Sequence, residues 1–151
     1  MTADPNCIFC KIVAGTIPCF RLHEDAATLA FLDVNPVNPG HALVIPRNHA
    51  ANLVASDERD LAAVMATARR VAAAIERVLA PHGMNLLQAN GLGAAQSVMH
   101  FHMHVIPRVA GDDLKMNWPL KPGDKAALAE LAARIRERLY ASGIALVSPE
   151  R

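Results

Sequence analysis

The chain has 151 residues with a formal net charge of +1, a hydrophobic fraction of 52%, seven His and three Cys. This length predicts a single domain over residues 1–151, and the hydrophobic fraction is too high for a disordered chain. The near-zero net charge argues against a general nucleic-acid binder, which needs a basic surface. The sequence shows no charged and apolar leader and no apolar run of about 18 residues, so we expect a cytoplasmic protein that binds neither nucleic acid nor membranes.

Four short segments are predicted to be β-strands, because β-branched or alternating apolar residues fill them and turn residues follow. They lie at residues 28–33, 41–46, 84–89 and 100–107. The loop between the first two contains Asn35-Pro36 and Asn38-Pro39-Gly40, and such turn residues are typical of a connection between neighbouring strands.

Two segments are predicted to be helices. Apolar residues recur at steps of three and four up to Leu79, which indicates an amphipathic helix with an N-cap at Ser56 and an end before Pro81. The second helix is predicted over about residues 125–140. Antiparallel strand pairs together with two helices indicate an α+β domain, in which helices cover an antiparallel sheet.

Three histidines alternate with apolar residues at the start of the last predicted strand. Side chains alternate between the two faces of a strand, so His100, His102 and His104 share one face while Phe101 and Met103 point into the core. A single His at such a position would be an ordinary surface residue. Three in register on one strand face are unfavourable for a purely structural role and indicate a function. A metal site and nucleophilic catalysis by an imidazole both remain open at this point.

The loop before this strand is rich in small residues and hydrogen-bond donors. Gly91, Gly93, Gln96 and Ser97 place backbone N–H groups, an amide and a hydroxyl beside the histidines, which suits a phosphate group. The glycines alone would indicate only an ordinary turn.

Cys7 and Cys10 form a CxxC pair near the first residue of the sequence. A redox pair of this kind usually precedes a helix in a βαβ unit, whereas half of a zinc site needs two further ligands. His49 and one of the three alternating histidines could supply them. Cys19 is expected to be a small buried residue.

Several segments resemble the histidine triad (HIT) superfamily, and in particular its Hint-like bacterial members. The similarity covers about residues 7–108, and residues 117–119 also resemble that branch. The matching segments are Cys7-Ile8-Phe9-Cys10-Lys11-Ile12, Phe31-Leu32-Asp33, Pro39-Gly40-His41, Val44-Ile45-Pro46-Arg47-Asn48-His49 and Gln96-Ser97-Val98-Met99-His100-Phe101-His102-Met103-His104-Val105-Ile106.

This resemblance implies a HIT-like fold with about five strands and two main helices, in a homodimer whose sheets join. It places the motif-bearing core at about residues 7–119 and a C-terminal helical extension at about 120–151. It also implies hydrolysis or transfer at the α-phosphate of nucleotide conjugates, such as phosphoramidates or dinucleoside polyphosphates of a purine nucleotide. The reaction would pass through a nucleotidyl-histidine and release a nucleoside monophosphate, with no catalytic metal.

The resemblance also assigns roles to residues. His102 would be the nucleophile, His41 and His104 would support it, and Ser97 would contact the phosphate or the leaving group, as would Gln96. Asp33 would bind the ribose hydroxyls. The remaining nucleotide-binding positions would be Ile8, Phe9, Ile12, Phe31, Val34, Leu43, Asn90 and Ala95.

The zinc-binding members of the family imply a structural Zn²⁺ held by Cys7, Cys10, His49 and His100. One departure from the family is Ala95, where a glycine is common, so a positive φ at this position would strain the loop. Two other functions stay open: a nucleotide-sensing or partner-binding module with little catalysis, and a redox protein that uses the CxxC pair.

Overall fold

The computed structural model describes residues 2–116 and 119–141 of the chain. Asn117 and Trp118, part of the segment that resembles the bacterial branch, lie outside the described residues, and so does the end of the predicted C-terminal extension. The described residues form two compact units, which divide between Leu114 and Lys115.

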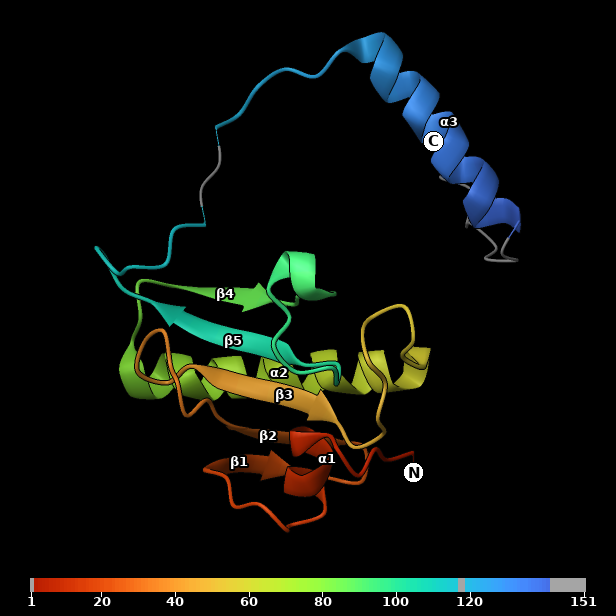
Figure 1. Ribbon diagram of the computed structural model, residues 1–151. Helices are drawn as coiled ribbons and strands as arrows, with labels where there is room; N and C mark the ends of the chain where they lie inside the picture. Colours follow the sequence, from red (N-terminus) through yellow and green to blue (C-terminus); the bar gives the residue numbers. More distant parts are fainter. Residues whose placement is uncertain (1, 117–118, 142–151) are drawn as a thin grey trace. The chain divides into compact units, whose positions relative to one another are not determined.

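The first unit is built on a five-stranded antiparallel sheet in the order β1-β2-β3-β5-β4 (Figure 1). This confirms the predicted α+β class and the sheet of about five strands. The elements in chain order are α1 (Ile8–Val13), β1 (Arg21–Glu24), β2 (Thr28–Leu32), β3 (Ala42–Pro46), α2 (Glu58–Leu79), β4 (Gly83–Leu87), a 3-10 turn (Leu92–Ala94), β5 (Met103–Arg108) and α3 (Lys125–Ala141).

Two elements were missed from the sequence. Strand β1 exposes most of its side chains and therefore has no apolar period, and α1 has only six residues, too few for a helical pattern to be recognised. The long helix also starts one residue later than predicted. Asp57 is its N-cap and accepts a hydrogen bond from the Arg59 amide, while the Ser56 hydroxyl donates to the Asn52 carbonyl.

The strand that carries the histidines is shorter than predicted. Strand β5 begins at Met103, so the prediction of a strand from His100 is wrong. The reason is that the preceding backbone bonds outside the sheet: the Phe101 amide donates to the Ala50 carbonyl at 2.7 Å. The alternation of side chains nevertheless holds, because Phe101 and Val105 are buried in one core while the histidines face the other way.

The alternation divides the sheet into two apolar faces. Ala30, Val44 and Val105 pack on one side against α2, which runs along the sheet in Figure 1. Phe31 and Leu43, one position along in their strands, pack on the other side with Phe9, Cys10 and further residues of the α1 region. His104 pairs with Leu43 in the strand ladder and therefore belongs to this second face.

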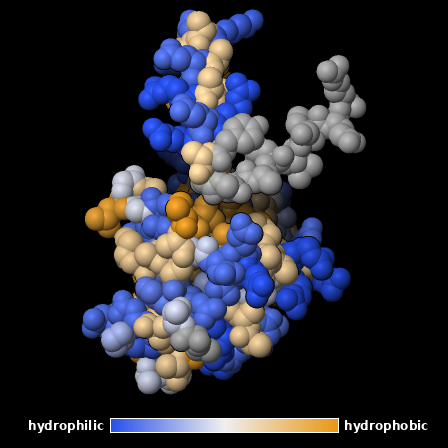
Figure 2. All heavy atoms as spheres, turned by 90° about the vertical axis from the view of Figure 1, so that its right-hand side faces the viewer, coloured by the Kyte–Doolittle hydropathy of each residue, from blue (hydrophilic) through white to orange (hydrophobic). Residues whose placement is uncertain are grey.

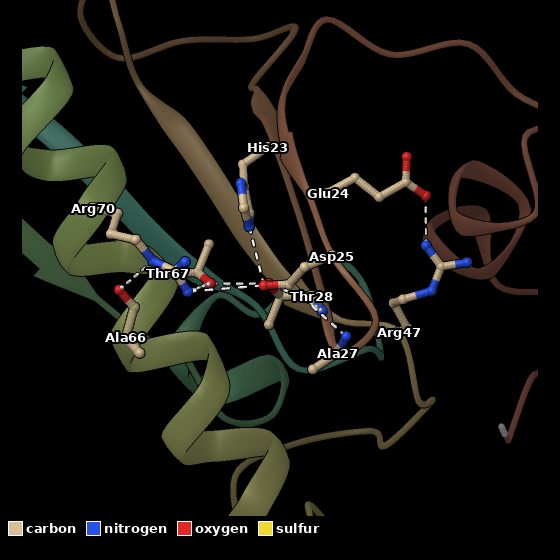
Figure 3. Close-up of polar contacts among 9 residues, drawn as sticks. All are labelled: His23, Glu24, Asp25, Ala27, Thr28, Arg47, Ala66, Thr67 and Arg70. Atoms are coloured by element: carbon tan, nitrogen blue, oxygen red, sulfur yellow. Dashed lines mark hydrogen bonds and ion pairs between the residues drawn. The ribbon is translucent and has the colours of Figure 1, made fainter.

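The turn between β1 and β2 is tied to α2 by polar side chains. One carboxylate oxygen of Asp25 accepts hydrogen bonds from the Ala27 and Thr28 amides and from the Thr28 hydroxyl, and the other lies 3.0 Å from His23 Nε2 (Figure 3). The Thr28 hydroxyl also meets that of Thr67 on α2 at 2.9 Å. His23 is half-buried here.

The second unit consists mainly of α3. Its apolar residues Leu128, Leu131 and Ile135 are each about half exposed, at 55%, 49% and 52%. Figure 2 shows hydrophilic residues in blue beside moderately hydrophobic residues in tan on this helix. Within residues 2–116 and 119–141, no helix combines the length and the apolar character that a membrane span requires.

Candidate active site

His102 lies on the face of the sheet that carries α1. Its ring packs edge-on against the Phe9 ring, with centroids 5.3 Å apart and an interplanar angle of 83°, and the His104 ring lies 4.9 Å away. His102 is 2% exposed. The apolar contact with α1 and the polar contact with β5 together fix the plane of this imidazole.

One ring nitrogen of His102 is committed to the backbone. Nδ1 lies 2.6 Å from the His100 carbonyl oxygen, which can only accept, so Nδ1 carries the proton and donates. The neutral ring therefore keeps the lone pair of Nε2 free. Burial is the largest influence on this side chain and lowers the pKa of His102, so the ring is neutral at neutral pH.

His41 and His104 form a directional pair beside it. The Val37 amide donates to His41 Nδ1 at 3.3 Å, which leaves the proton of the neutral ring on Nε2. His41 Nε2 lies 2.8 Å from His104 Nδ1, so the first ring donates and the second accepts. The proton of neutral His104 is then on Nε2, where the ring can donate to a ligand.

Burial keeps this pair neutral. It lowers the pKa of His41, against the opposing effect of the Asp33 carboxylate, whose Oδ2 lies 3.7 Å from His41 Nδ1. Burial also lowers the pKa of His104 to about 4, helped by His102 and His41. The Asp33 side chain remains partly exposed, and its other oxygen accepts from the Asn35 amide at 2.8 Å.

The loop before the histidines is held in place by Gln96. Its side chain is buried: Oε1 accepts from the Gly91 amide at 2.7 Å, while Nε2 donates to the Ala51 and Val98 carbonyls. Its own amide donates to the Gly91 carbonyl. The N–H donors of Gln96 are therefore all hydrogen-bonded within the protein. These bonds hold the shape of the loop.

Ser97 differs from its neighbour. It is exposed, and among the described residues it has no hydrogen-bond partner, so its hydroxyl is available to a ligand. Ala95 has φ of 61° and ψ of 29°, which is the left-handed conformation anticipated from the comparison with glycine. A side chain in this region costs about 1 kcal/mol or more.

The apolar residues assigned to the base fall into two groups. Four of them are at most 6% exposed and pack together in one cluster, from which Phe9 contacts the His102 ring: Phe9, Ile12, Phe31 and Leu43. Ile8 and Val34 are instead exposed, at 46% and 72%. Asn90 is exposed as well, and its side chain joins the Leu53 amide to the Gln88 side chain.

The structure brings the four predicted metal ligands together. The ligand atoms of Cys7, Cys10, His49 and His100 all lie within 4.8 Å of one another. Three sulfur–nitrogen separations are 3.4, 3.5 and 3.6 Å. Tetrahedral zinc with Zn–S of about 2.3 Å and Zn–N of about 2.0–2.1 Å would place these atoms about 3.6 Å apart.

The chemistry of the donors also fits zinc. His100 Nε2 donates to the Pro46 carbonyl at 3.0 Å, which turns the lone pair of Nδ1 toward both sulfurs. Burial lowers the pKa of His100 to about 4, so the ring is a neutral ligand. Among the described cysteines, all three are free thiols.

Two contributors to the site were not predicted. The Val37 amide sets the proton position in the His41–His104 pair, and the buried Asn38 side chain donates to the Pro107 carbonyl at 2.9 Å and to Asp112 at 2.8 Å. Asn38 thereby joins the loop that carries His41 to the end of β5. A backbone amide leaves no signal in a sequence, and Asn38 was interpreted only as a turn residue.

The comparisons with known proteins agree with this geometry. A family model described as HIT domain matches residues 14–111. An adenosine 5′-monophosphoramidase of Schizosaccharomyces pombe is 40% identical over 135 residues, which cover 89% of this chain and 98% of that protein.

Solved structures agree as well. A HIT family protein from Bacillus subtilis has a TM-score of 0.84 and 39% identity, over 89% of this chain and 97% of the other. A zinc-bound histidine triad family protein from Mycobacterium smegmatis has a TM-score of 0.69 and 36% identity, over 85% and 97%. The sequence motif, the sheet and the paired imidazoles thus lead to one assignment: this chain belongs to the HIT domain family.

Proposed function

We propose that this protein is a nucleotide-binding hydrolase that cleaves nucleotide conjugates at the α-phosphate and releases a nucleoside monophosphate. The observation that carries the proposal is the state of His102, whose Nδ1 is committed to the His100 carbonyl while Nε2 is free beside the His41–His104 pair. The name of the similar yeast protein, an adenosine 5′-monophosphoramidase, supports a purine nucleotide joined to an amine as the substrate.

In the first step, Nε2 of His102 forms a bond to the α-phosphorus and the bond from phosphorus to the leaving group breaks. The His100 carbonyl stabilises the positive charge that develops on the attacking ring, because it accepts the Nδ1 proton. The departing amine takes a proton through the exposed Ser97 hydroxyl, which takes another from solvent, while neutral His104 keeps its Nε2–H and donates a hydrogen bond.

In the second step, water attacks the phosphorus of the nucleotidyl-histidine. The nitrogen–phosphorus bond breaks, His102 recovers its lone pair, and the nucleoside monophosphate leaves. The proton of the attacking water passes to solvent through the exposed Ser97 hydroxyl, which gives up one proton as it takes another. Asp33 binds the ribose hydroxyls in this scheme, since its carboxylate is partly exposed next to His41.

We further propose that Cys7, Cys10, His49 and His100 hold a structural zinc ion. The separations of the four donors support this, and four protein ligands leave no position open for a substrate. Such an ion would fix α1, and with it Phe9, against the segment that contains His102. A bound zinc would also exclude redox cycling between the two cysteines.

A homodimer is the proposed assembly. Strand β4 is at the edge of the sheet, where its unpaired backbone groups can extend the ladder into a second copy. Leu86 on β4 and Met65 on α2 are 46% and 49% exposed and line one groove. We place the protein in the cytoplasm, since free thiols suit a reducing compartment.

The experiment that tests the hydrolase is a rapid quench of the protein with adenosine phosphoramidate. Mass spectrometry should find AMP attached to the peptide that contains His102, together with continued release of AMP. Tight AMP binding without turnover would instead favour a nucleotide-sensing module. A label on another residue would contradict the assignment of the nucleophile.

A further inference from the structure

A second group of metal-binding side chains lies apart from the cysteine cluster. His41, His104 and Asp33 each offer one ligand atom, and these atoms all lie within 4.8 Å of one another. They come from separate parts of the sheet: β5 carries His104, His41 directly precedes β3, and Asp33 follows β2. None of them belongs to the proposed structural zinc site.

The three residues differ from the cysteine cluster in their access to solvent. His41 is 3% exposed, whereas His104 and Asp33 are partly exposed. An ion could therefore approach from the side of the carboxylate. Three protein ligands would leave one tetrahedral position open, which distinguishes the group from a closed structural site.

The two imidazoles already aim at one point. His41 Nε2 and His104 Nδ1 lie 2.8 Å apart, with a single proton between them. An ion that replaces this proton would push the nitrogens apart by about half an ångström, to the separation required by bonds of about 2.0–2.1 Å. The displaced proton has an acceptor, because His41 Nδ1 can take it in exchange for the long Val37 hydrogen bond of 3.3 Å and then faces Asp33 Oδ2, 3.7 Å away.

We propose that His41 Nε2, His104 Nδ1 and Asp33 form a second, open binding site for a divalent transition-metal ion. Two imidazoles and a carboxylate favour zinc, cobalt, nickel or copper over magnesium or calcium. On binding, two nitrogen–metal bonds form, the Nε2–H bond of His41 breaks, and its proton moves to Nδ1 of the same ring. The ion would bind Nδ1 of the ring whose Nε2–H donates to the substrate in the proposed reaction, so this inference rests on the same side chains as the proposed function.

Cobalt is the probe that distinguishes the two groups. Co²⁺ bound by thiolates shows a strong sulfur-to-metal charge-transfer band, whereas nitrogen and oxygen ligands give only weak visible bands. The protein as isolated, with its metal content measured first, is titrated with Co²⁺ by absorbance and calorimetry. We expect one ion per chain that binds without a thiolate band.

Three variants complete the test. His104→Gln and Asp33→Asn should each raise the Kd for this ion by at least about tenfold, while the exposed His82→Gln serves as the control and keeps it. Asn at position 33 can still accept the Asn35 amide, so this variant preserves the local hydrogen bond.

The proposal is overturned if all bound cobalt shows a thiolate band, or if both variants bind the ion as the wild type does. It is equally overturned if no ion beyond the cysteine cluster binds. The titration measures no turnover, so its failure would leave the proposed hydrolase untouched.

Discussion

Two histidine groups share one face of this sheet, and their hydrogen bonds differ in direction. In the cysteine cluster, His100 turns one nitrogen to the Pro46 carbonyl and the other to two sulfurs, so both nitrogens have protein partners. In the neighbouring group, the Nδ1 nitrogens of His102 and His104 have protein partners, and each ring leaves Nε2 for a ligand. His100 and His102, two positions apart, thus differ in the atoms that they leave open. Both nitrogens of His100 have protein partners, whereas Nε2 of His102 is free for a ligand.

This difference shows that backbone carbonyls decide which nitrogen is open in His100 and His102, whereas the His41 side chain decides it in His104. The Pro46 and His100 carbonyls each fix one ring tautomer. Substitutions in one group should therefore change turnover, and substitutions in the other should change metal content and stability.

The largest expected effect is on turnover. His102→Ala should lower kcat for adenosine phosphoramidate by at least about 10³-fold, because it removes the attacking nitrogen. Zinc content should stay as in the wild type, measured by elemental analysis. His82→Ala, at an exposed position, is the control and should keep full activity. Persistent turnover in the first variant would contradict the assignment.

In the cysteine cluster, a substitution should change metal content and stability. Cys10→Ser should remove the metal and lower the free energy of unfolding by about 3 kcal/mol or more, a fall in Tm on the order of 10 °C. Thermal unfolding measures the change. Cys19→Ser is the matched control, since Cys19 lies outside the cluster. Equal effects of the two substitutions would rule out a structural ion.

A smaller effect concerns pH. The pKa of His104 is about 4 in the folded chain against an ordinary value of 6.5, so only the unfolded chain takes up a proton between these values. The free energy of unfolding should be constant above about pH 6.5 and fall as the pH drops toward 4. Denaturant titrations of the wild type and of His104→Gln test this, and the variant should show a shallower slope.

The smallest effect is expected at two alanines with positive φ, Ala95 in the loop before the histidines and Ala80 at the end of α2. Ala95→Gly and Ala80→Gly should each stabilise the protein by about 0.4–1 kcal/mol, since both alanines have positive φ, at 61° and 44°. Because Ala80 lies at the end of α2, any change of kcat should be confined to Ala95→Gly. Denaturant midpoints measure the gain, and a loss of stability in both variants would refute it.

Much of this arrangement was predictable because it depends on local patterns. The alternation through His104 predicted the correct faces of the strand. The period of the long helix predicted α2 up to Leu79, its last residue, with a start one residue too early. The four residues proposed to hold zinc were named from residue type and from the resemblance to the family, and their ligand atoms lie within 4.8 Å of one another. The antiparallel sheet followed from the short strands and their turns.

The remainder depends on contacts that no local pattern records. The contact of Gln96 with the substrate stays a prediction, and the bonds from its side-chain amide to the Ala51 and Val98 carbonyls were not predicted. The Val37 donor is the backbone amide, and the identity of the side chain does not indicate what that amide binds. Strand β5 begins later than predicted because the Phe101 amide donates to the Ala50 carbonyl, which is distant in the sequence.

The contact between Cys7 and His100 joins residues 93 positions apart, which has a consequence for the order of folding. Closing so long a loop costs more entropy than forming the hairpin of β2 and β3, so local contacts should form earlier. On a ribosome, the first helix must wait for almost two-thirds of the chain to be synthesised before its partner exists. The segment that contains His102 is therefore assembled among the last parts of the domain.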